Sequence, residues 1–318
     1  MKKVLRNGVF LLFLLYESKL YSQSAFIRMS DSTKIYYSVQ GKGRDTLVFL
    51  HGGPGQNSNG VGPDLSPLAK SHVLILYDQR GCGFSDQGDT NKLTPATNVE
   101  DLEELRQFFH INKLILVGHS WGCLLATLYT SKYPDHVKKL LLLSPAPPTR
   151  QLFQQRFTSF AKKDSVGQSR LAQLRLQLDT THHPGFICRQ IFDINDKFYY
   201  AHPKNIRRKR GDYCNFPDDV FRKQAITARR TLQSLGNYNV IPLLQKISQF
   251  SLIIEGAQTP VPVIEFYEWA KALPQAKLLF IKKVGHAYPM VERPKAFLGA
   301  VEKFLNGNWS DNLSTTIK

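Results

Sequence analysis

Short runs of consecutive apolar residues recur along most of the chain and predict buried strands. Stretches with helical spacing separate them, residues 99–109 being one example. Continuous apolar runs are typical of parallel strands that are covered on both faces, because neither side of such a strand meets water. The predicted strands of this kind comprise residues 46–50, 73–77, 113–117, 139–143, 250–254 and 277–281.

Two earlier runs alternate apolar and polar residues and predict an antiparallel hairpin. Residues 25–29 and 34–39 are separated by the polar sequence SDST, which suits a hairpin at the edge of a sheet. With these two strands, the sequence predicts a chain of the α/β class. Its centre is a doubly wound, mostly parallel sheet of eight strands.

Residues 147–240 interrupt this pattern. The segment is rich in Gln, Arg and aromatic residues with helix-like spacing, and it lies between two predicted strands. An insertion at that place would cover the carboxyl ends of the strands, so we expect a mainly helical cap there. The expected core then comprises residues 25–146 and 241–307, and the polar residues 308–318 are expected to form a flexible tail.

A pentapeptide between a predicted strand and a predicted helix supplies a candidate nucleophile. Ser120 is the middle residue of the sequence GHSWG, directly after the apolar run 113–117. On a strand-to-helix turn of this type the hydroxyl stands clear of the sheet, and the flanking glycines let backbone segments approach closely. The alternative interpretation is an ordinary tight turn that contains two glycines and a serine.

A glycine-rich loop after the strand 46–50 supplies candidate oxyanion donors. Its sequence, HGGPG (residues 51–55), exposes backbone N–H groups that no side chain obstructs, which suits it to hold the oxyanion of a tetrahedral intermediate. The two expected donors are the N–H groups of Gly53 and Trp121. A flexible turn without a catalytic role is the alternative.

A histidine after the last predicted strand is the leading candidate for a general base. His286 lies in the sequence VGHA on the loop that follows residues 277–281. That loop is where a base must lie to meet a serine on a central strand of the same sheet. The competing histidines are His51, His119, His182 and His183.

Four motifs in a fixed order carry a resemblance to a known family. The sequences HGGPG, DQRGCGFS, GHSWG and GHAYPMVE resemble those of the proline iminopeptidase branch of the α/β-hydrolase superfamily, over about residues 26–305. The resemblance implies a serine hydrolase that removes N-terminal residues, typically proline, from short peptides through an acyl-enzyme. It also implies a helical cap, no metal or organic cofactor, and nucleophile and base roles for Ser120 and His286.

The chain departs from the family at the third catalytic residue. Where the family has an aspartate after the strand before the last, this chain has Thr259. Loss of a triad aspartate can lower turnover by about four orders of magnitude, because the imidazole loses its orienting partner. Glu255 at the strand end is the first candidate for a substitute acid, and Glu265 and Glu268 on the following helix are the others. Glu255 as a solvated loop charge is the competing interpretation.

The charge of the cap is a second departure. Family members that act on free N-termini place cap glutamates near the substrate ammonium, yet residues 151–240 contain no glutamate and carry sixteen Lys or Arg against seven Asp. Such a cap favours an anion over an ammonium group, so a carboxylesterase acting on small esters, including anionic ones, is an alternative. A binding protein that kept the fold with weakened catalysis is another. The remaining candidate ammonium partners are Asp193, Asp196, Asp212, Asp218 and Asp219.

The first residues predict export. Lys2, Lys3 and Arg6 precede the apolar run 9–16, and small residues follow at 22–24, which resembles a signal peptide spanning residues 1–24 and is too short to cross a bilayer. A periplasmic or secreted protein is therefore expected, with a membrane anchor through this segment as the alternative. Cys188 and Cys214 could pair in an oxidising compartment, although spacing does not decide it.

The strongly basic composition first suggests a nucleic-acid partner. The formal net charge is +17, yet the longest basic run, residues 207–210, has only four residues, and no nucleic-acid-binding motif accompanies it. A small molecule or short peptide is the expected partner, and the sequence leaves the oligomeric state open.

Overall fold

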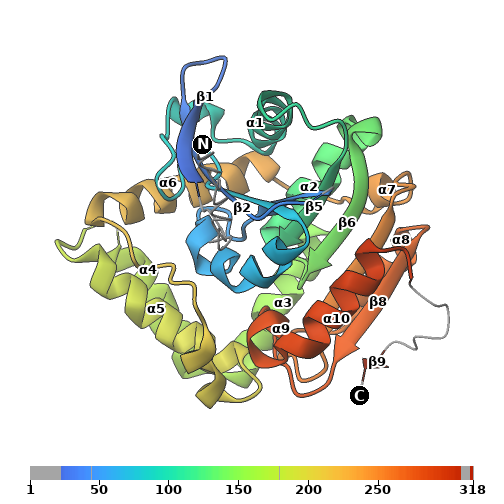
Figure 1. The fold of residues 1–318 in the computed structure, drawn as a ribbon. Coiled ribbons are helices and arrows are strands. Elements are labelled where there is room, and N and C mark those ends of the chain that lie inside the picture. Colours follow the sequence, from blue (N-terminus) through green and yellow to red (C-terminus); the bar gives the residue numbers. More distant parts are fainter. Residues whose placement is uncertain (1–22, 44, 179, 309–315, 318) are drawn as a thin grey trace, which may run out of the picture.

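The computed structural model describes residues 23–317 except for residues 44, 179 and 309–315 (Figure 1). The predicted signal peptide therefore lies outside the described residues, apart from Gln23 and Ser24, which begin the first strand. Within the described residues, no helix combines the length and the apolar character that crossing a membrane requires.

A single sheet forms the centre of the molecule, in the order β1-β2-β4-β3-β5-β6-β7-β8-β9. The pairs β1–β2 and β2–β4 are antiparallel and every other pair is parallel. The strands are β1 (Gln23–Arg28), β2 (Lys34–Gln40), β3 (Thr46–Leu50), β4 (Val73–Tyr77), β5 (Leu114–His119), β6 (Val137–Leu143), β7 (Phe250–Gly256), β8 (Ala276–Ile281) and β9 (Thr316–Ile317).

The eight predicted strands are confirmed as β1 to β8, including the antiparallel edge hairpin. The two-residue strand β9 falls within the predicted tail, and it pairs with the end of β8.

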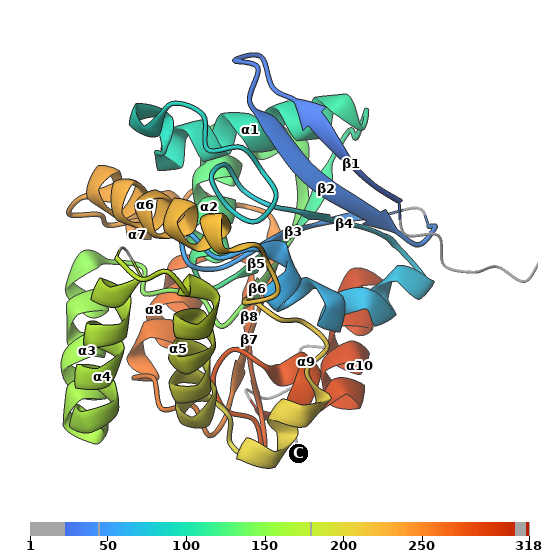
Figure 2. The ribbon, with the colours of Figure 1, turned by 90° about the vertical axis from the view of Figure 1, so that its left-hand side faces the viewer.

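Helices cover both faces of this sheet (Figures 1 and 2). The α-helices are α1 (Pro95–Phe108), α2 (Trp121–Lys132), α3 (Arg150–Lys163), α4 (Ser165–Gln177), α5 (Pro184–Tyr199), α6 (Asp218–Leu235), α7 (Ile241–Leu244), α8 (Ile264–Ala272), α9 (Pro289–Glu292) and α10 (Pro294–Leu305). The 3-10 helices are η1 (Ser58–Gly60), η2 (Gly62–Lys70), η3 (Thr90–Lys92), η4 (Pro134–His136) and η5 (Pro203–Arg208).

Strand β3 shows why its sequence is continuously apolar. Val48 and Leu50 belong to the hydrophobic cluster that contains side chains of α1, α2 and α8. Leu47 and Phe49 point to the opposite cluster, which contains side chains of η2 and α10. Because successive side chains of a strand point to opposite faces, a strand buried on both faces requires apolar residues at every position.

In the sequence, α3 to α6 and η5 lie between β6 and β7. In Figure 2, α3, α4, α5 and α6 form a layer on one side of the sheet. This layer lies over the carboxyl ends of the strands. A side chain at Gly55, after β3, would collide with Ala228 of α6, and one at Gly285, after β8, would collide with the backbone of Tyr199 in α5. A substrate that reaches the strand ends must therefore pass beside these helices.

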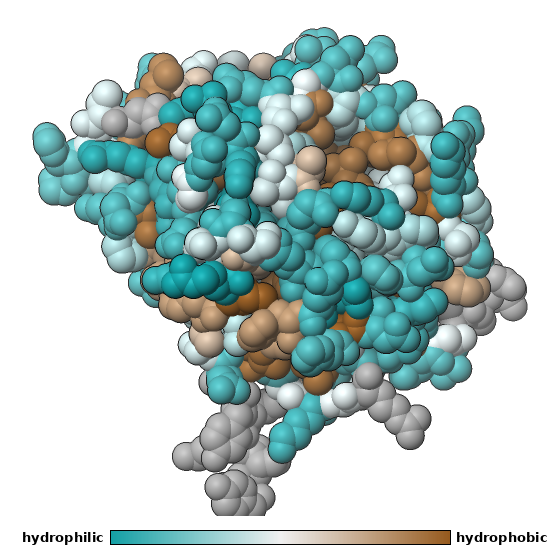
Figure 3. Space-filling view, turned by 90° about the horizontal axis from the view of Figure 1, so that it is seen from above, coloured by the Kyte–Doolittle hydropathy of each residue, from teal (hydrophilic) through white to brown (hydrophobic). Residues whose placement is uncertain are grey.

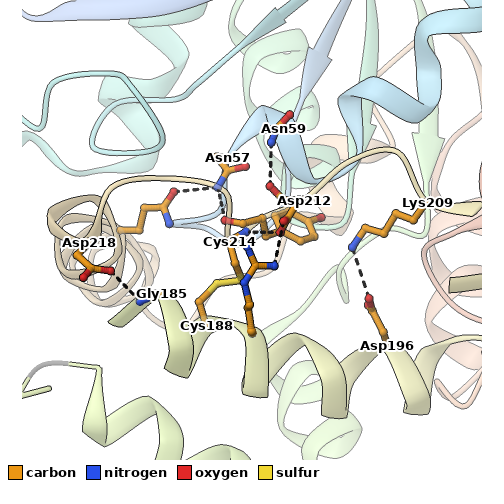
Figure 4. Close-up of a disulfide and its surroundings, with 12 residues drawn as sticks. Asn57, Asn59, Gly185, Cys188, Asp196, Lys209, Asp212, Cys214 and Asp218 are labelled. Carbon is orange, nitrogen blue, oxygen red and sulfur yellow. Dashed lines mark hydrogen bonds and ion pairs between the residues drawn. A yellow bond between two sulfur atoms is a disulfide. The ribbon is translucent and has the colours of Figure 1, made fainter. Parts of the chain in front are cut away.

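A disulfide joins two parts of the cap. Cys188 of α5 is bonded to Cys214, which precedes α6 (Figure 4). Nearby, Asn57 and Asn59 of the core donate hydrogen bonds to the carbonyl oxygens of Tyr213 and Asp212 at 3.1 and 2.9 Å. The segment that carries Cys214 is therefore fixed to both α5 and the core.

Candidate active site

Ser120 stands at the tight turn between β5 and α2. Its φ of 52° and ψ of −114° place a non-glycine residue in a sparsely populated conformation, and such strain persists only where the surroundings impose it. A Cβ at Gly122 would lie 1.9 Å from the carbonyl oxygen of Leu50, and one at Gly118 would lie 2.7 Å from that of Gly122. Both glycines are therefore required by close backbone contacts, and the Ser120 side chain remains partly exposed.

His286 and Glu255 are paired in the buried interior beside this turn. The Nδ1 atom of His286 lies 3.0 Å from a carboxylate oxygen of Glu255. The side chains are 4% and 0% exposed, so the pair is shielded from water. The other carboxylate oxygen of Glu255 accepts the N–H of Gly256 at 2.9 Å. Glu255 ends β7, and its neighbours in the sheet therefore hold its position.

Backbone contacts connect the serine turn with the histidine loop. The N–H of Ser120 donates to the carbonyl of Leu143 at the end of β6. The next residue, Ser144, accepts the N–H of Ala287 through its hydroxyl at 3.0 Å. The two segments thus meet at the carboxyl ends of the strands. In these described residues no direct hydrogen bond joins the Ser120 hydroxyl to His286, a bond that is often long in free enzymes.

The remaining candidates for the third residue have other partners. Thr259 accepts the N–H of Val261 through its hydroxyl at 3.2 Å. Glu265 forms a buried ion pair with Arg156 of α3, and Glu268 is half-buried on α8. Of the three carboxylates weighed from the sequence, Glu255 is the one that the structure brings to His286.

The competing histidines have other environments. His51 is buried, which lowers its pKa to about 4, and its Nε2 atom accepts the N–H of Gln79 at 3.0 Å. Burial likewise lowers the pKa of His119 to about 3. His182 and His183 are exposed in the loop before α5.

The predicted oxyanion donors are the N–H groups of Trp121 and Gly53. Trp121 is the first residue of α2, so its N–H has no partner within the helix. Gly53 lies on the exposed part of the HGGPG loop with φ of 117°. Among the described residues, neither N–H donates to another backbone group. Both are therefore free to bind an oxyanion.

Gln79 connects these two donor segments, and the sequence reasoning missed it. Its side chain donates to the carbonyl of His51 at 2.9 Å and accepts the indole N–H of Trp121 at the same distance. It is 2% exposed. Its position two residues after β4, within DQRGCGFS, was the available signal. The neighbouring Asp78 and Arg80 anchor the loop through Ser58 and Asp101.

Within the described residues, no group of three or more His, Cys, Asp or Glu side chains is arranged to hold a metal ion. The donors at the site are instead a hydroxyl, an imidazole, a carboxylate and backbone amides. These groups can perform nucleophilic and acid–base chemistry.

Comparison with known proteins agrees with this geometry. A family model described as the alpha/beta hydrolase fold matches residues 45–292. The chain belongs to the α/β-hydrolase family. The proline iminopeptidase of Heyndrickxia coagulans is 28% identical over 272 residues, which cover 83% of this chain and 91% of that protein. The proline iminopeptidase of Saccharolobus solfataricus is 28% identical over 296 residues, or 87% and 89% of the two chains.

Solved structures show the same fold. An α/β-fold hydrolase from Bacillus anthracis aligns with a TM-score of 0.71 at 19% identity, covering 91% of this chain and 99% of that one. An α/β hydrolase from a deep-sea metagenome library aligns with a TM-score of 0.67 at 22% identity, over 91% and 100%. These structures show the fold alone. The family model and the two proline iminopeptidases make the chain a proline iminopeptidase-like member of the family and support a hydrolase.

Proposed function

We propose that the protein is a serine hydrolase that cleaves a carboxylic ester or amide through an acyl-enzyme at Ser120. The observation that carries this proposal is the buried contact between His286 and Glu255, 3.0 Å long, at the sheet edge where Ser120 is held in a strained turn. The serine, the base and the acid of a triad come from three different strand ends, as family members require.

The chemistry follows from the three side chains. The Ser120 hydroxyl attacks the acyl carbon while the Nε2 atom of His286 takes its proton. Glu255 accepts from Nδ1–H, which fixes the tautomer and stabilises the imidazolium. The amides of Gly53 and Trp121 hold the oxyanion. Return of the proton to the leaving group gives the acyl-enzyme, which water releases by the same steps.

A fluorophosphonate probe tests the nucleophile. We expect the wild-type protein to be labelled and Ser120→Ala to remain unlabelled. Ser169→Ala serves as the control, because Ser169 is an exposed serine on the cap helix α4. An unlabelled wild type would favour the binding-protein alternative, and a labelled Ser120→Ala would overturn the assignment of the nucleophile.

Similarity to proline iminopeptidases makes a short peptide with an N-terminal proline the first candidate substrate. The five candidate ammonium partners give this candidate little support. Asp196 faces Lys209 at 3.5 Å, Asp212 faces Arg189 at 3.1 Å, and Asp218 accepts the N–H of Gly185. Asp193 and Asp219 are exposed.

A small ester is the second candidate, favoured by the excess of basic residues in the cap. Turnover of a prolyl arylamide is to be compared with turnover of an acyl p-nitrophenyl ester by the same preparation. Hydrolysis of the arylamide supports the peptidase, whereas hydrolysis of the ester alone rejects it.

We further propose that the protein is exported. The basic and apolar residues at the start of the sequence support this, as does the Cys188–Cys214 disulfide, since disulfides persist mainly in oxidising compartments. Mass spectrometry of the N-terminus after expression in a bacterial host tests it. A chain that retains Met1 in the cytoplasmic fraction would contradict export.

A further inference from the structure

The last long helix of the cap, α6, lies against the loop that carries one of the proposed oxyanion donors. A Cβ at Gly55, in the HGGPG loop, would lie 2.5 Å from the carbonyl oxygen of Gln224 and 2.7 Å from the methyl group of Ala228. Gly53 belongs to the same loop, and a Cβ there would lie 2.7 Å from the backbone nitrogen of Gln56. The cap therefore contacts this tightly folded loop two residues beyond the Gly53 amide.

A buried amide side chain of α6 joins this loop to a second one. The Oε1 atom of Gln224 accepts the N–H of Gly83 at 3.1 Å and a hydrogen bond from the side chain of Asn57 at 3.2 Å. Asn57 follows the HGGPG loop, and Gly83 belongs to the sequence DQRGCGFS. Gln224 and Asn57 are 8% and 1% exposed. Both hydrogen bonds are therefore shielded from water, where such bonds are stronger.

Backbone groups fix the orientation of the two amides. A backbone N–H only donates, so the Gln224 atom that meets the N–H of Gly83 must be the side-chain oxygen. That oxygen requires a donor from Asn57, and so does the carbonyl of Tyr213, 3.1 Å from Nδ2 of Asn57. The NH2 group of Asn57 supplies both hydrogen bonds. Asn57 thus lies between α6 and the segment that carries Cys214 (Figure 4).

Neighbouring side chains of α6 hold the DQRGCGFS loop as well. The Nζ atom of Lys223 donates to the carbonyls of Gly83 and Ser85 at 3.0 and 2.7 Å. The hydroxyl of Thr227 donates to the carbonyl of Gly81 at 3.1 Å. Residues four apart lie on the same side of a helix, so one side of α6 is bonded along this loop.

Buried amides therefore hold the HGGPG loop at both ends. At its start, Gln79 of the core donates to the carbonyl of His51. At its end, Gln224 of the cap accepts from Asn57. The Gly53 amide lies between these two anchors, on the exposed part of the loop. A donor stabilises a developing oxyanion well only when its position is set before the reaction begins.

We propose that Gln224 is a positioning residue that sets the place of the Gly53 amide, so that the oxyanion hole is complete only with α6 docked. The inference rests on the proposed serine hydrolase. Gln224 acts through Asn57 rather than by touching the substrate. Its loss should weaken binding of the tetrahedral intermediate more than binding of the substrate, which lowers kcat with little change in KM.

Gln224→Met tests the two hydrogen bonds, because methionine keeps the length of the side chain and removes the oxygen that accepts both. On an acyl p-nitrophenyl ester, kcat should fall about 10-fold and KM should stay within about twofold of wild type. Gln224→Glu should keep more activity, because a carboxylate oxygen accepts the same two bonds. Gln224→Asn withdraws the acceptor by one methylene group and tests the same bonds if the methionine variant does not fold.

A trifluoromethyl ketone reports on the oxyanion donors directly. Such a ketone forms a tetrahedral adduct with a serine nucleophile, and the oxyanion of the adduct takes the place of the oxyanion in the intermediate. The inhibition constant of the ketone should therefore rise in Gln224→Met by the same factor by which kcat/KM falls. A substitution that only destabilises the fold would not produce this parallel change.

Thr231→Val is the matched control on the same helix. The buried hydroxyl of Thr231 donates to the carbonyl of Leu93 at 3.4 Å. This variant therefore removes a cap-to-core hydrogen bond that involves neither the HGGPG loop nor the DQRGCGFS loop. It should keep the kcat and the inhibition constant of wild type. Urea unfolding compares the stability of the variants.

The outcomes separate this inference from the proposed function. Unchanged kcat in Gln224→Met, an equal loss in Thr231→Val, or a glutamate variant no better than methionine would overturn the role of Gln224 and leave the serine hydrolase standing. A fall in kcat without a rise in the inhibition constant would do the same. A wild type with neither turnover nor probe labelling would overturn both proposals.

Discussion

The strained serine at the β5–α2 turn illustrates how single residues are determined by their neighbours. Ser120 takes a positive φ of 52° because the helix must leave the strand at once, and glycines on either side allow the backbones to touch. The same turn exposes the hydroxyl and leaves the N–H of Trp121 without a helical partner. One local conformation therefore prepares both the proposed nucleophile and a proposed oxyanion donor.

Gly122→Ala tests the close contact behind this turn. The added methyl group would lie 1.9 Å from the Leu50 carbonyl, so we expect a loss of about 3 kcal/mol of stability, at the upper end of overpacking costs, with loss of activity. Gly299→Ala is the control, because nothing lies within 4 Å of that site in α10. Alanine should stabilise that helix by about 0.5–1 kcal/mol. Urea unfolding measures the stability of both variants. A Gly122→Ala variant as stable as wild type would contradict the structure.

Glu255→Gln tests the third residue of the proposed triad. A neutral amide cannot stabilise the imidazolium and can select the wrong tautomer, so kcat should fall about 10⁴-fold with a much smaller change in KM. Thr259→Ala should keep wild-type kcat, since the Thr259 hydroxyl accepts only from Val261. Steady-state kinetics on a common ester decides between them. Full activity of Glu255→Gln would mean that another group orients His286.

At the scale of elements, a buried carboxylate joins α1 to α2. Glu103 of α1 accepts two hydrogen bonds from Arg106, at 2.9 and 2.7 Å, and one from the Tyr129 hydroxyl at 2.8 Å. Burial alone would raise its pKa, but the hydrogen bonds from Arg106, Tyr129 and Gln107 outweigh that effect and lower it to about 2. The helix that follows Ser120 is thus anchored on its neighbour.

This carboxylate gives stability a predictable pH dependence. Because the pKa of Glu103 falls from 4.5 to about 2 on folding, its contribution is complete above pH 4.5 and is lost as the pH falls towards 2. Glu103→Gln should cost about 1–3 kcal/mol at pH 7, and the deficit should shrink in acid. Tyr129→Phe should lose part of the same stability, because Glu103 then lacks the hydrogen bond from the Tyr129 hydroxyl. Parallel stability curves for wild type and Glu103→Gln between these pH values would contradict the prediction.

For the whole molecule, the important relation is the attachment of the cap to the core. Glu292, beyond the loop that carries His286, accepts the backbone N–H groups of Gly285 and of two cap residues. On the other side, the disulfided segment is fixed to the loop after β3. The surface seen from above in Figure 3 is mainly hydrophilic with separate apolar patches, as expected for a solvent-facing side. The cap is therefore attached to the core at two places, through Glu292 and through the segment that carries Cys214.

Removing the disulfide tests how much the Cys188–Cys214 bond contributes to the stability of the protein. The double variant Cys188→Ser/Cys214→Ser opens a loop with a sequence separation of 26, which corresponds to about 3.5 kcal/mol of unfolding free energy in the chain-entropy model. Reduced wild type should lose a similar amount, and dithiothreitol should have no effect on the variant. Cys82 and Cys123 are free and buried, so they provide no substitute bond. Equal stability of variant and oxidised wild type would contradict the bond.

The amino-acid sequence by itself determined the sheet, because continuous apolar runs are a local signal that needs no partner to be recognised. It also indicated Ser120, His286 and the HGGPG loop, since each lies on a turn whose glycines are local requirements. The tertiary structure alone decided that Glu255 lies 3.0 Å from His286 and that Glu265 is paired with Arg156 instead. Those properties depend on which strand ends and cap helices meet in space. Contacts between residues far apart in the chain produce no periodic pattern in the sequence.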